Sequence, residues 1–253
     1  MPELRAFACG STSHRLSMLL RGAPSQARRY PAGVFVYDGG GRRILFDTGY
    51  APRPWKTGLR GALYQRLLPP KVDGREVIAR QIDPATVSHV VVSHLHPDHI
   101  GGMLYFEHAT FIMSRACVNA LDHARVRDGV LHGLIPDWFD PARAIIVDEF
   151  TPGPHGIGQA DVLGDPGFVL LDLPGHSPGH IGALVAGRVV LAADASWGRD
   201  MLGQEDRVRA IPRSITHDYD AVKATAQALL RAEAAGLRLL FSHDQHPTGV
   251  DLL

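Results

Sequence analysis

Short apolar runs, rich in β-branched and aromatic residues and closed by glycine, proline or a polar side chain, recur along the chain. This is the pattern of β-strands whose side chains are largely buried. The expected strands are residues 34–37, 43–47, 90–92, 111–114, 144–147, 168–173, 183–185, 189–193 and 237–241. The turn Asp38-Gly39-Gly40-Gly41 joins the first two strands and predicts a β-hairpin.

Between these strands the apolar spacing changes to that of helices. Residues 115–126 and 218–235 are expected helices, and Asp218 can cap the second of them. Leu59, Leu63 and Leu67 form one helical stripe, which predicts either a helix packed on the core or a segment that covers substrate or forms a dimer.

The alternation of strands and helices favours an α/β fold, with residues 1–253 as a single domain and 50–70 as a lid or insertion segment. The first 30 residues show little pattern beyond a short strand or helical turn at 16–20. The Gly/Pro-rich residues 151–167 are expected to be a surface connection.

The composition limits the classes of partner that the protein is expected to bind. Lys+Arg and Asp+Glu are equal at 26 each among 253 residues, so no overall field favours nucleic acid or a membrane, and a small-molecule substrate is expected. The two cysteines, Cys9 and Cys117, cannot form a disulfide framework. The N-terminus lacks the order of a signal peptide, and no run of about 18 apolar residues occurs. We therefore expect a cytoplasmic protein.

One stretch concentrates the candidate chemistry. Ser93-His94-Leu95-His96-Pro97-Asp98-His99-Ile100-Gly101-Gly102 directly follows the apolar run 90–92. Proline and the two glycines predict that the chain turns tightly there instead of continuing as a helix. Imidazole and carboxylate are zinc ligands, so the stretch is interpreted as a metal-binding loop at the end of a core strand.

Other expected strands also end in possible ligands. His176 follows 168–173, Asp194 follows 189–193, and His243 follows 237–241. The candidate ligands are therefore His94, His96, Asp98, His99, His176, Asp194 and His243. This set is too large for one tetrahedral zinc and is sufficient for two metals that share a bridging carboxylate.

These motifs, taken in order, resemble the metallo-β-lactamase superfamily. The matching features are His94-x-His96-x-Asp98-His99, the segment Pro174-Gly175-His176-Ser177-Pro178-Gly179-His180, Asp194 after a strand, a late His243, and the early Asp47-Thr48-Gly49. The resemblance implies a four-layer αββα sandwich of two mixed β-sheets flanked by helices. It also implies a metal-dependent hydrolase.

Residue by residue, the resemblance assigns His94, His96 and His176 to one metal. It assigns Asp98, His99 and His243 to the second, with Asp194 bridging the pair. It further implies supporting roles for Asp47 and His180, whereas the remaining histidines, such as His14 and His217, are expected in surface or loop positions.

Within the superfamily, the chain is similar to the N-acyl-homoserine lactonase branch. True β-lactamases bring a cysteine near the position of the bridging aspartate, and Cys9 and Cys117 lie elsewhere. Two positions depart from the lactonase pattern: Trp197 replaces a tyrosine that polarises the lactone carbonyl, and Pro97 replaces an aromatic residue of the bacillus-type enzymes. An indole N–H can donate one hydrogen bond but has no hydroxyl.

The expected cofactor is two Zn²⁺ ions, with Mn, Fe or Co as alternatives. Two ions about 3.5–4 Å apart bring the pKa of a bridging water near neutrality. The resulting hydroxide would open a lactone or cleave a related ester, with Asp98 passing the proton to the leaving group. Opening of N-acyl-homoserine lactones would make the protein a quorum-quenching enzyme. Alternatives are a thioesterase or general esterase, a phosphotriesterase, and, outside hydrolases, a di-iron redox or sensing protein. A homodimer is a further expectation, with residues 50–70 and Trp138-Phe139 as its apolar interface.

Overall fold

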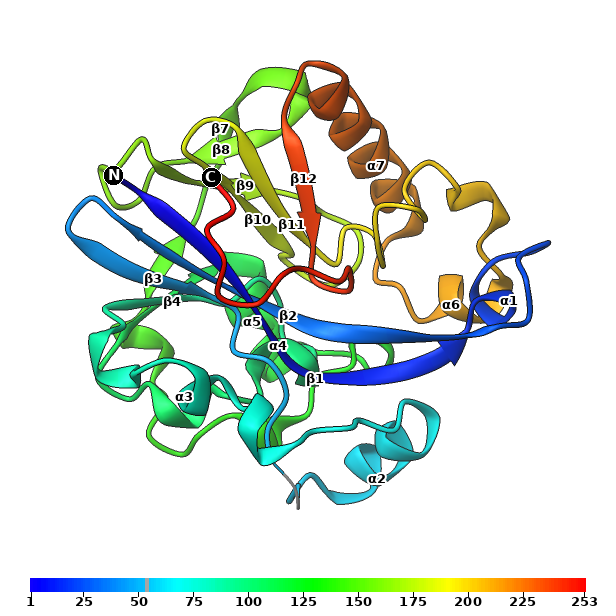
Figure 1. Cartoon of the computed structure of the whole chain (residues 1–253). Coiled ribbons are helices and arrows are strands. Elements are labelled where there is room, and N and C mark those ends of the chain that lie inside the picture. The colour runs from blue at the N-terminus through cyan, green and yellow to red at the C-terminus, as the bar shows by residue number, and fades with distance from the viewer. Residues whose placement is uncertain (53–54) are drawn as a thin grey trace.

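The computed structural model of the protein describes residues 1–52 and 55–253, and within them two six-stranded β-sheets face each other (Figure 1). The first sheet has the order β1 (Glu3–Arg15), β2 (Ala27–Gly39), β3 (Arg42–Phe46), β4 (His89–Val91), β5 (Thr110–Ser114), β6 (Ile145–Val147). The second has the order β12 (Arg238–Phe241), β11 (Val189–Ala193), β10 (Ile181–Val185), β9 (Phe168–Asp172), β8 (Gly158–Ala160), β7 (Thr151–Pro152).

Both sheets are mixed. In the first sheet the pairs β1–β2 and β2–β3 are antiparallel, whereas β3, β4, β5 and β6 run parallel. In the second sheet only β11 and β12 are parallel. A core that includes Phe35, Phe46, Phe168 and Leu191 fills the space between the sheets. Sheets that are apolar on both faces need a helical layer outside each, because each face must be shielded from water.

Helices provide these outer layers. The helices of the described structure are α1 (Leu16–Leu19), α2 (Gly58–Leu67), α3 (Ile78–Gln81), α4 (Pro97–Ile100), α5 (Arg115–His123), α6 (Ala210–Ser214) and α7 (Tyr219–Ala234). Helix α7 lies outside the second sheet, while α3, α4 and α5 lie outside the first (Figure 1). The four-layer αββα arrangement of two mixed sheets is thus confirmed.

The long helix α7 shows how the local sequence determines its element. Asp218 Oδ1 accepts hydrogen bonds from the backbone N–H groups of Asp220 and Ala221, both at 3.0 Å, as an N-cap does. Ala226 and Leu229 are fully buried against the second sheet. Helix α5, in contrast, ends at His123 and not at residue 126, and Ala124 is already extended.

The N-terminal region is where the structure differs most from the prediction. Residues 3–15 form the 13-residue strand β1, which pairs with β2 around an irregularity between Ala8 and Ser11. Small and polar residues such as Gly10 and Ser11 hide the alternation that identifies a strand. The predicted surface connection 151–167 likewise contains the short strands β7 and β8.

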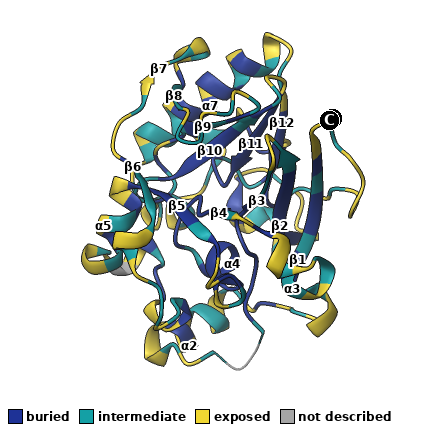
Figure 2. Cartoon of the chain, turned by 90° about the vertical axis from the view of Figure 1, so that its left-hand side faces the viewer, coloured by how far each residue is buried: buried dark blue, intermediate teal, exposed yellow. Residues whose placement is uncertain are grey.

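The segment 50–70 behaves differently from the core helices. Residues 53–54 lie outside the described part of the chain, and α2 covers residues 58–67. The exposed fractions of Leu59, Leu63 and Leu67 are 90%, 54% and 64%, so the leucine stripe of α2 is not packed on the core. In Figure 2, α2 lies at the lower end of the molecule, apart from the two sheets. The version of the prediction that buried this stripe is wrong.

Strand direction brings the candidate residues to one edge of the molecule. β3 and β4 are parallel and end just before Asp47 and Ser93, whereas β11 and β12 are parallel and end just before Asp194 and Ser242. Among the described residues, none of the helices has the length and apolar character that crossing a bilayer requires. The homodimer and the cytoplasmic setting stay predictions.

Candidate metal centre

The histidine-rich stretch after β4 is a tight turn held against the loop that follows β3. Pro97 begins the single helical turn α4, which ends at Ile100 and is followed by Gly101. A Cβ atom at Gly101 would lie 2.0 Å from Ala51 N, and one at Gly102 would lie 2.4 Å from Thr48 O. Both positions therefore require glycine so that the two loops can pack together.

One group of ligand atoms is formed by two side chains of this turn and two from the second sheet. His94, His96, His176 and Asp194 each offer an atom, and these atoms all lie within 4.8 Å of one another. His176 Nε2 is 3.0 Å from His96 Nδ1 and 3.5 Å from Asp194 Oδ2. Three nitrogens and a carboxylate oxygen are a donor set that suits zinc.

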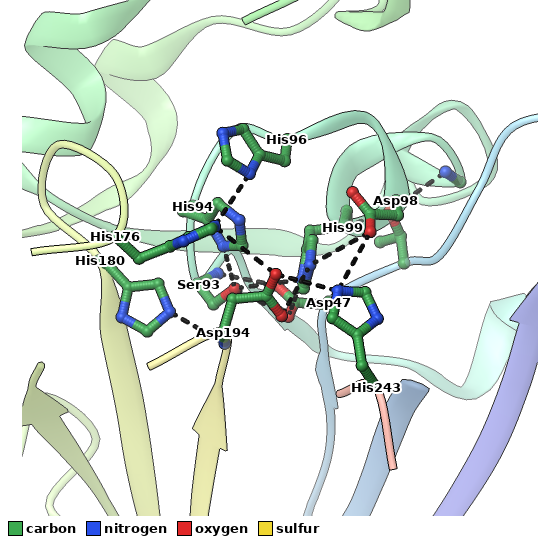
Figure 3. Close-up of polar contacts among 12 residues, drawn as sticks. Asp47, Ser93, His94, His96, Asp98, His99, His176, His180, Asp194 and His243 are labelled. Atoms are coloured by element: carbon green, nitrogen blue, oxygen red, sulfur yellow. Dashed lines mark hydrogen bonds and ion pairs between the residues drawn. The ribbon is translucent and has the colours of Figure 1, made fainter. Parts of the chain in front are cut away.

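A second group shares the same aspartate. Asp98, His99, Asp194 and His243 again lie within 4.8 Å of one another. Asp194 Oδ2 is 3.0 Å from His243 Nε2, and Asp194 Oδ1 is 3.3 Å from His99 Nε2. Figure 3 shows Asp194 between the two sets of side chains. A carboxylate in this place can contact two cations at once. These seven residues are called the metal cluster below.

Whether a cation fits can be judged from the polar atoms. His94 Nε2, His99 Nε2 and Asp194 Oδ1 are buried without a hydrogen-bond partner in the described structure. A buried polar atom without a partner is costly, and such atoms are uncommon in folded proteins. All three atoms belong to the metal cluster, so the donor set fits divalent metal ions.

Behind the metal cluster, Asp47 fixes the rings of two histidines. Asp47 Oδ2 lies 2.7 Å from His99 Nδ1, and Ser93 donates to Asp47 through its backbone N–H and its hydroxyl, both at 2.8 Å. Ser93 Oγ is also 3.0 Å from His94 Nδ1. These contacts occupy the Nδ1 atoms and leave Nε2 of both histidines directed to the metal cluster, as supporting groups around metal ligands do.

Hydrogen bonds also hold two other members of the metal cluster, Asp194 and His243. His180 Nδ1 is 2.8 Å from Leu173 O, and the backbone N–H of Asp194 donates to His180 Nε2 at 3.1 Å. Burial lowers the pKa of His180 to about 4, so its ring is neutral and can accept this bond. On the other side, His243 Nδ1 is 2.7 Å from Pro31 O.

The backbone around the metal cluster is strained. Asp47 has φ 63°, and Ala193, directly before Asp194, has φ 44°. Non-glycine residues rarely adopt positive φ, and such strain concentrates at functional sites. Both residues lie where a strand ends and a carboxylate must be turned toward the metal cluster or its histidines.

The electrostatics differ between the two groups. Burial lowers the pKa of His94 and His176 well below the usual range, which keeps both imidazoles neutral, as metal ligands must be. Burial also opposes the charge on His243, but Asp194 and Asp98 outweigh it and raise its pKa to about 9. The carboxylates thus favour positive charge at this end of the metal cluster.

A cavity of about 560 Å³ opens above the metal cluster, with His96, Asp98, His176, Asp194 and His243 among its lining residues. Most of its wall is apolar. Helix α2 contributes Leu63 and Leu67, and the region around α6 and the start of α7 contributes Pro212, Ile215 and Val222. The size and lining are those of a small-molecule site.

The structure places every predicted site residue at this cavity or directly behind it. Trp197, three residues after Asp194, lines the cavity with its ring centroid 6.4 Å from that of His243. One histidine predicted to be in a surface or loop position lies elsewhere, because His14 belongs to β1 and lines the cavity. His217 lies in the loop before α7, as predicted, and its Nδ1 is 3.1 Å from the buried Asp128 Oδ1.

Further residues of the site were not predicted from the sequence. Tyr30 and Tyr64 line the cavity, and the carbonyl of Pro31 orients His243. None belongs to a ligand motif, and Tyr30 and Pro31 follow the weakly patterned N-terminal region. Ser93 could have been found, because it directly precedes His94 and closes the apolar run of β4.

Comparisons with known proteins agree with this geometry. The family model described as the metallo-beta-lactamase superfamily matches residues 28–240. The N-acyl homoserine lactonase AttM of Azorhizobium caulinodans is 27% identical over 226 residues, covering 85% of this chain and 79% of that protein. A probable metallo-hydrolase of Mycobacterium tuberculosis is 29% identical over 184 residues, covering 68% of this chain and 58% of that protein.

A solved structure has the same fold. It is an N-acyl homoserine lactone hydrolase with the product N-hexanoyl-L-homoserine bound at its catalytic metal centre, with TM-score 0.74, 22% identity, and coverage of 96% of this chain and 93% of that one. The αββα fold and the histidine/aspartate cluster at the sheet edge define a metal-binding protein of the metallo-hydrolase type. The chain belongs to the metallo-beta-lactamase superfamily.

Proposed function

We propose that the protein is a dinuclear zinc hydrolase that opens N-acyl-homoserine lactones. The observation that carries the proposal is the metal cluster at the floor of a largely apolar cavity of about 560 Å³. The similarity to AttM lactonases supports the substrate class. The α2 segment is proposed to cover this cavity as part of a single catalytic domain.

His94, His96 and His176 would hold one ion, Asp98, His99 and His243 the other, and Asp194 both. When bound, two zinc ions activate water and polarise the substrate carbonyl as Lewis acids. Asp98 orients the attacking water and then transfers its proton to the departing ring oxygen. Asp98 Oδ2 lies 3.6 Å from His243 Nε2 and 3.8 Å from His99 Nε2, so the carboxylate is held beside the reacting centre.

The cavity wall supports an acylated substrate. The polar lactone and amide would lie near the metal cluster, and the acyl chain would lie along Leu63, Leu67 and Ile215. Burying a methylene group contributes about 0.8 kcal/mol, so each added methylene that reaches the wall strengthens binding.

A substrate panel on metal-analysed protein tests the proposal. Ring opening of acyl-homoserine lactones is expected to exceed the turnover of aryl esters, thioesters and phosphotriesters, and to stop on chelation. Asp98→Asn should abolish turnover, whereas Asp122→Asn, an exposed carboxylate of α5, serves as the matched control.

The alternatives are separate outcomes of the same panel. Efficient thioester or aryl-ester cleavage without lactone opening would make the protein a general ester hydrolase. Phosphotriester turnover alone would make it a phosphotriesterase. Coloured, redox-active iron in place of colourless zinc would favour a di-iron redox or sensing protein.

A further inference from the structure

Hydrolysis of an ester develops negative charge on the carbonyl oxygen, and a donor already in place near that oxygen lowers the barrier. Several hydroxyl groups line the cavity above the metal cluster. Three of them already donate to backbone carbonyls: Ser196 to Gly198 at 2.9 Å, Thr216 to Pro212 at 3.0 Å, and Tyr219 to Glu205 at 2.6 Å. These three have no second proton to offer a substrate.

Tyr30 is also unsuited to this role. Its ring lies against those of Trp197 and His243, with centroids 6.3 and 6.1 Å away. Its hydroxyl, however, is enclosed by protein. Burial raises the pKa of Tyr30, and the charges that act on its hydroxyl come from Arg28 and Asp200, outside the metal cluster.

We propose that Tyr64 is a further catalytic residue, whose hydroxyl donates a hydrogen bond to the carbonyl oxygen of the bound ester. Tyr64 lines the cavity together with Asp98 and Asp194. Its hydroxyl lies 3.3 Å from that of Tyr50. A phenol has one proton and two lone pairs, and either hydroxyl of this pair can be the donor. With Tyr50 as the donor, the proton of Tyr64 is available for the substrate.

The Tyr64 side chain is tied to the metal loop even though α2 lies at the periphery. Tyr50 follows the loop in which Thr48 bonds twice to His99 O, through its backbone N–H at 2.7 Å and its hydroxyl at 2.8 Å. The ring of Trp55 stacks on that of Tyr50, with their centroids 5.9 Å apart, and its centroid lies 6.0 Å from that of the Tyr64 ring. These contacts fix the phenol relative to His99 without a core contact from the α2 leucines.

The charges around Tyr64 keep it a donor. Burial raises its pKa well above the usual value, and the negative charges of Asp98 and Asp194 act in the same direction. The phenol therefore stays protonated at neutral pH. Tyr64 lines the same cavity as both carboxylates.

This inference deepens the proposed function and rests on it for the lactone substrate. The test compares the wild type with Tyr64→Phe, each with its metal content measured. The variant is expected to keep its metal and its KM while kcat falls about 100-fold, the loss typical of one removed oxyanion donor. Tyr105→Phe, a hydroxyl deletion outside the cavity lining, is the matched control and should keep the wild-type kcat.

A second measurement follows the phenol itself. With a fluorinated tyrosine at position 64, whose phenol ionises at lower pH, the alkaline loss of activity should move to lower pH. An unmoved pH profile, an unchanged kcat in Tyr64→Phe, or a rise in KM alone would overturn the proposal. His14 lines the same cavity and shares a hydrogen bond with Thr12 at 3.2 Å. If kcat fell in His14→Phe and not in Tyr64→Phe, the donor would be His14, and the proposal would be overturned.

The failures of the two proposals are distinguishable. If the wild type opens lactones and Tyr64→Phe does so equally well, only the role of Tyr64 is wrong. If the wild type opens no lactone, the proposed substrate is wrong, and the same variants are measured on an aryl ester. The same fall in kcat is expected there, because that reaction also places charge on a carbonyl oxygen.

Discussion

The floor and the wall of the cavity are built in different ways. The floor is the metal cluster, whose side chains come from strand ends and whose rings are held by further hydrogen bonds. The wall includes Leu63 of α2, whose side chain makes no core contact and has an exposed fraction of 54%. Rigid strands thus position the candidate ligands, while a peripheral helix forms part of the cavity wall above them.

The largest expected effect comes from removing the residue shared by both halves of the floor. Asp194→Ala should lower lactone turnover by more than about 10³-fold, because members of one catalytic unit do not act independently. Metal content, measured by elemental analysis, should fall in parallel. Wild-type turnover in this variant would show that Asp194 does not belong to the reacting centre, and Asp122→Asn controls for the loss of a carboxylate.

A change behind the floor should have a smaller effect. Asp47→Asn removes the charge that orients His99 at 2.7 Å, and the loss of such supporting groups weakens metal affinity by about 10- to 100-fold. Competition with a chromogenic chelator measures this affinity. Unchanged affinity would mean that Ser93 and the surrounding backbone position His99 without Asp47.

The wall should affect substrate choice and leave the floor intact. Leu63→Glu places a charge on the cavity lining, and the loss in kcat/KM should be about 10-fold for long acyl chains, which corresponds to about 1.4 kcal/mol. Short-chain substrates should be nearly unaffected. Leu59→Glu is the matched control on the same helix, since Leu59 is 90% exposed and does not line the cavity. Equal losses for both chain lengths would mean that α2 does not contact the acyl chain.

The difference between floor and wall also explains which parts of the site could be predicted from the sequence. The floor is encoded locally: His94, His96, Asp98 and His99 lie within one turn after an apolar run, so their chemistry and their strand-end position could be read directly. The αββα fold followed from the resemblance that these motifs carry. Asp194 and His243 were recognisable because each follows a short apolar strand.

The wall could not be predicted in this way. The leucine stripe of α2 has the spacing of a buried helix, but no periodicity reports whether a helix faces the core or a cavity. His14 and Tyr30 reach the site only because β1 and β2 extend past the first sheet's core, and β1 carries small polar residues that conceal its strand pattern. Tertiary packing places these residues, and short-range sequence patterns contain little of that information.

We propose that the floor holds two metal ions and that both are needed for lactone opening. The most direct measurement is the recovery of lactone turnover as zinc is added stepwise to chelated, metal-free protein. Turnover is expected to rise to a plateau at two equivalents per chain, one for each of the two groups that share Asp194. A plateau at one equivalent, or full turnover before any metal is added, would contradict it.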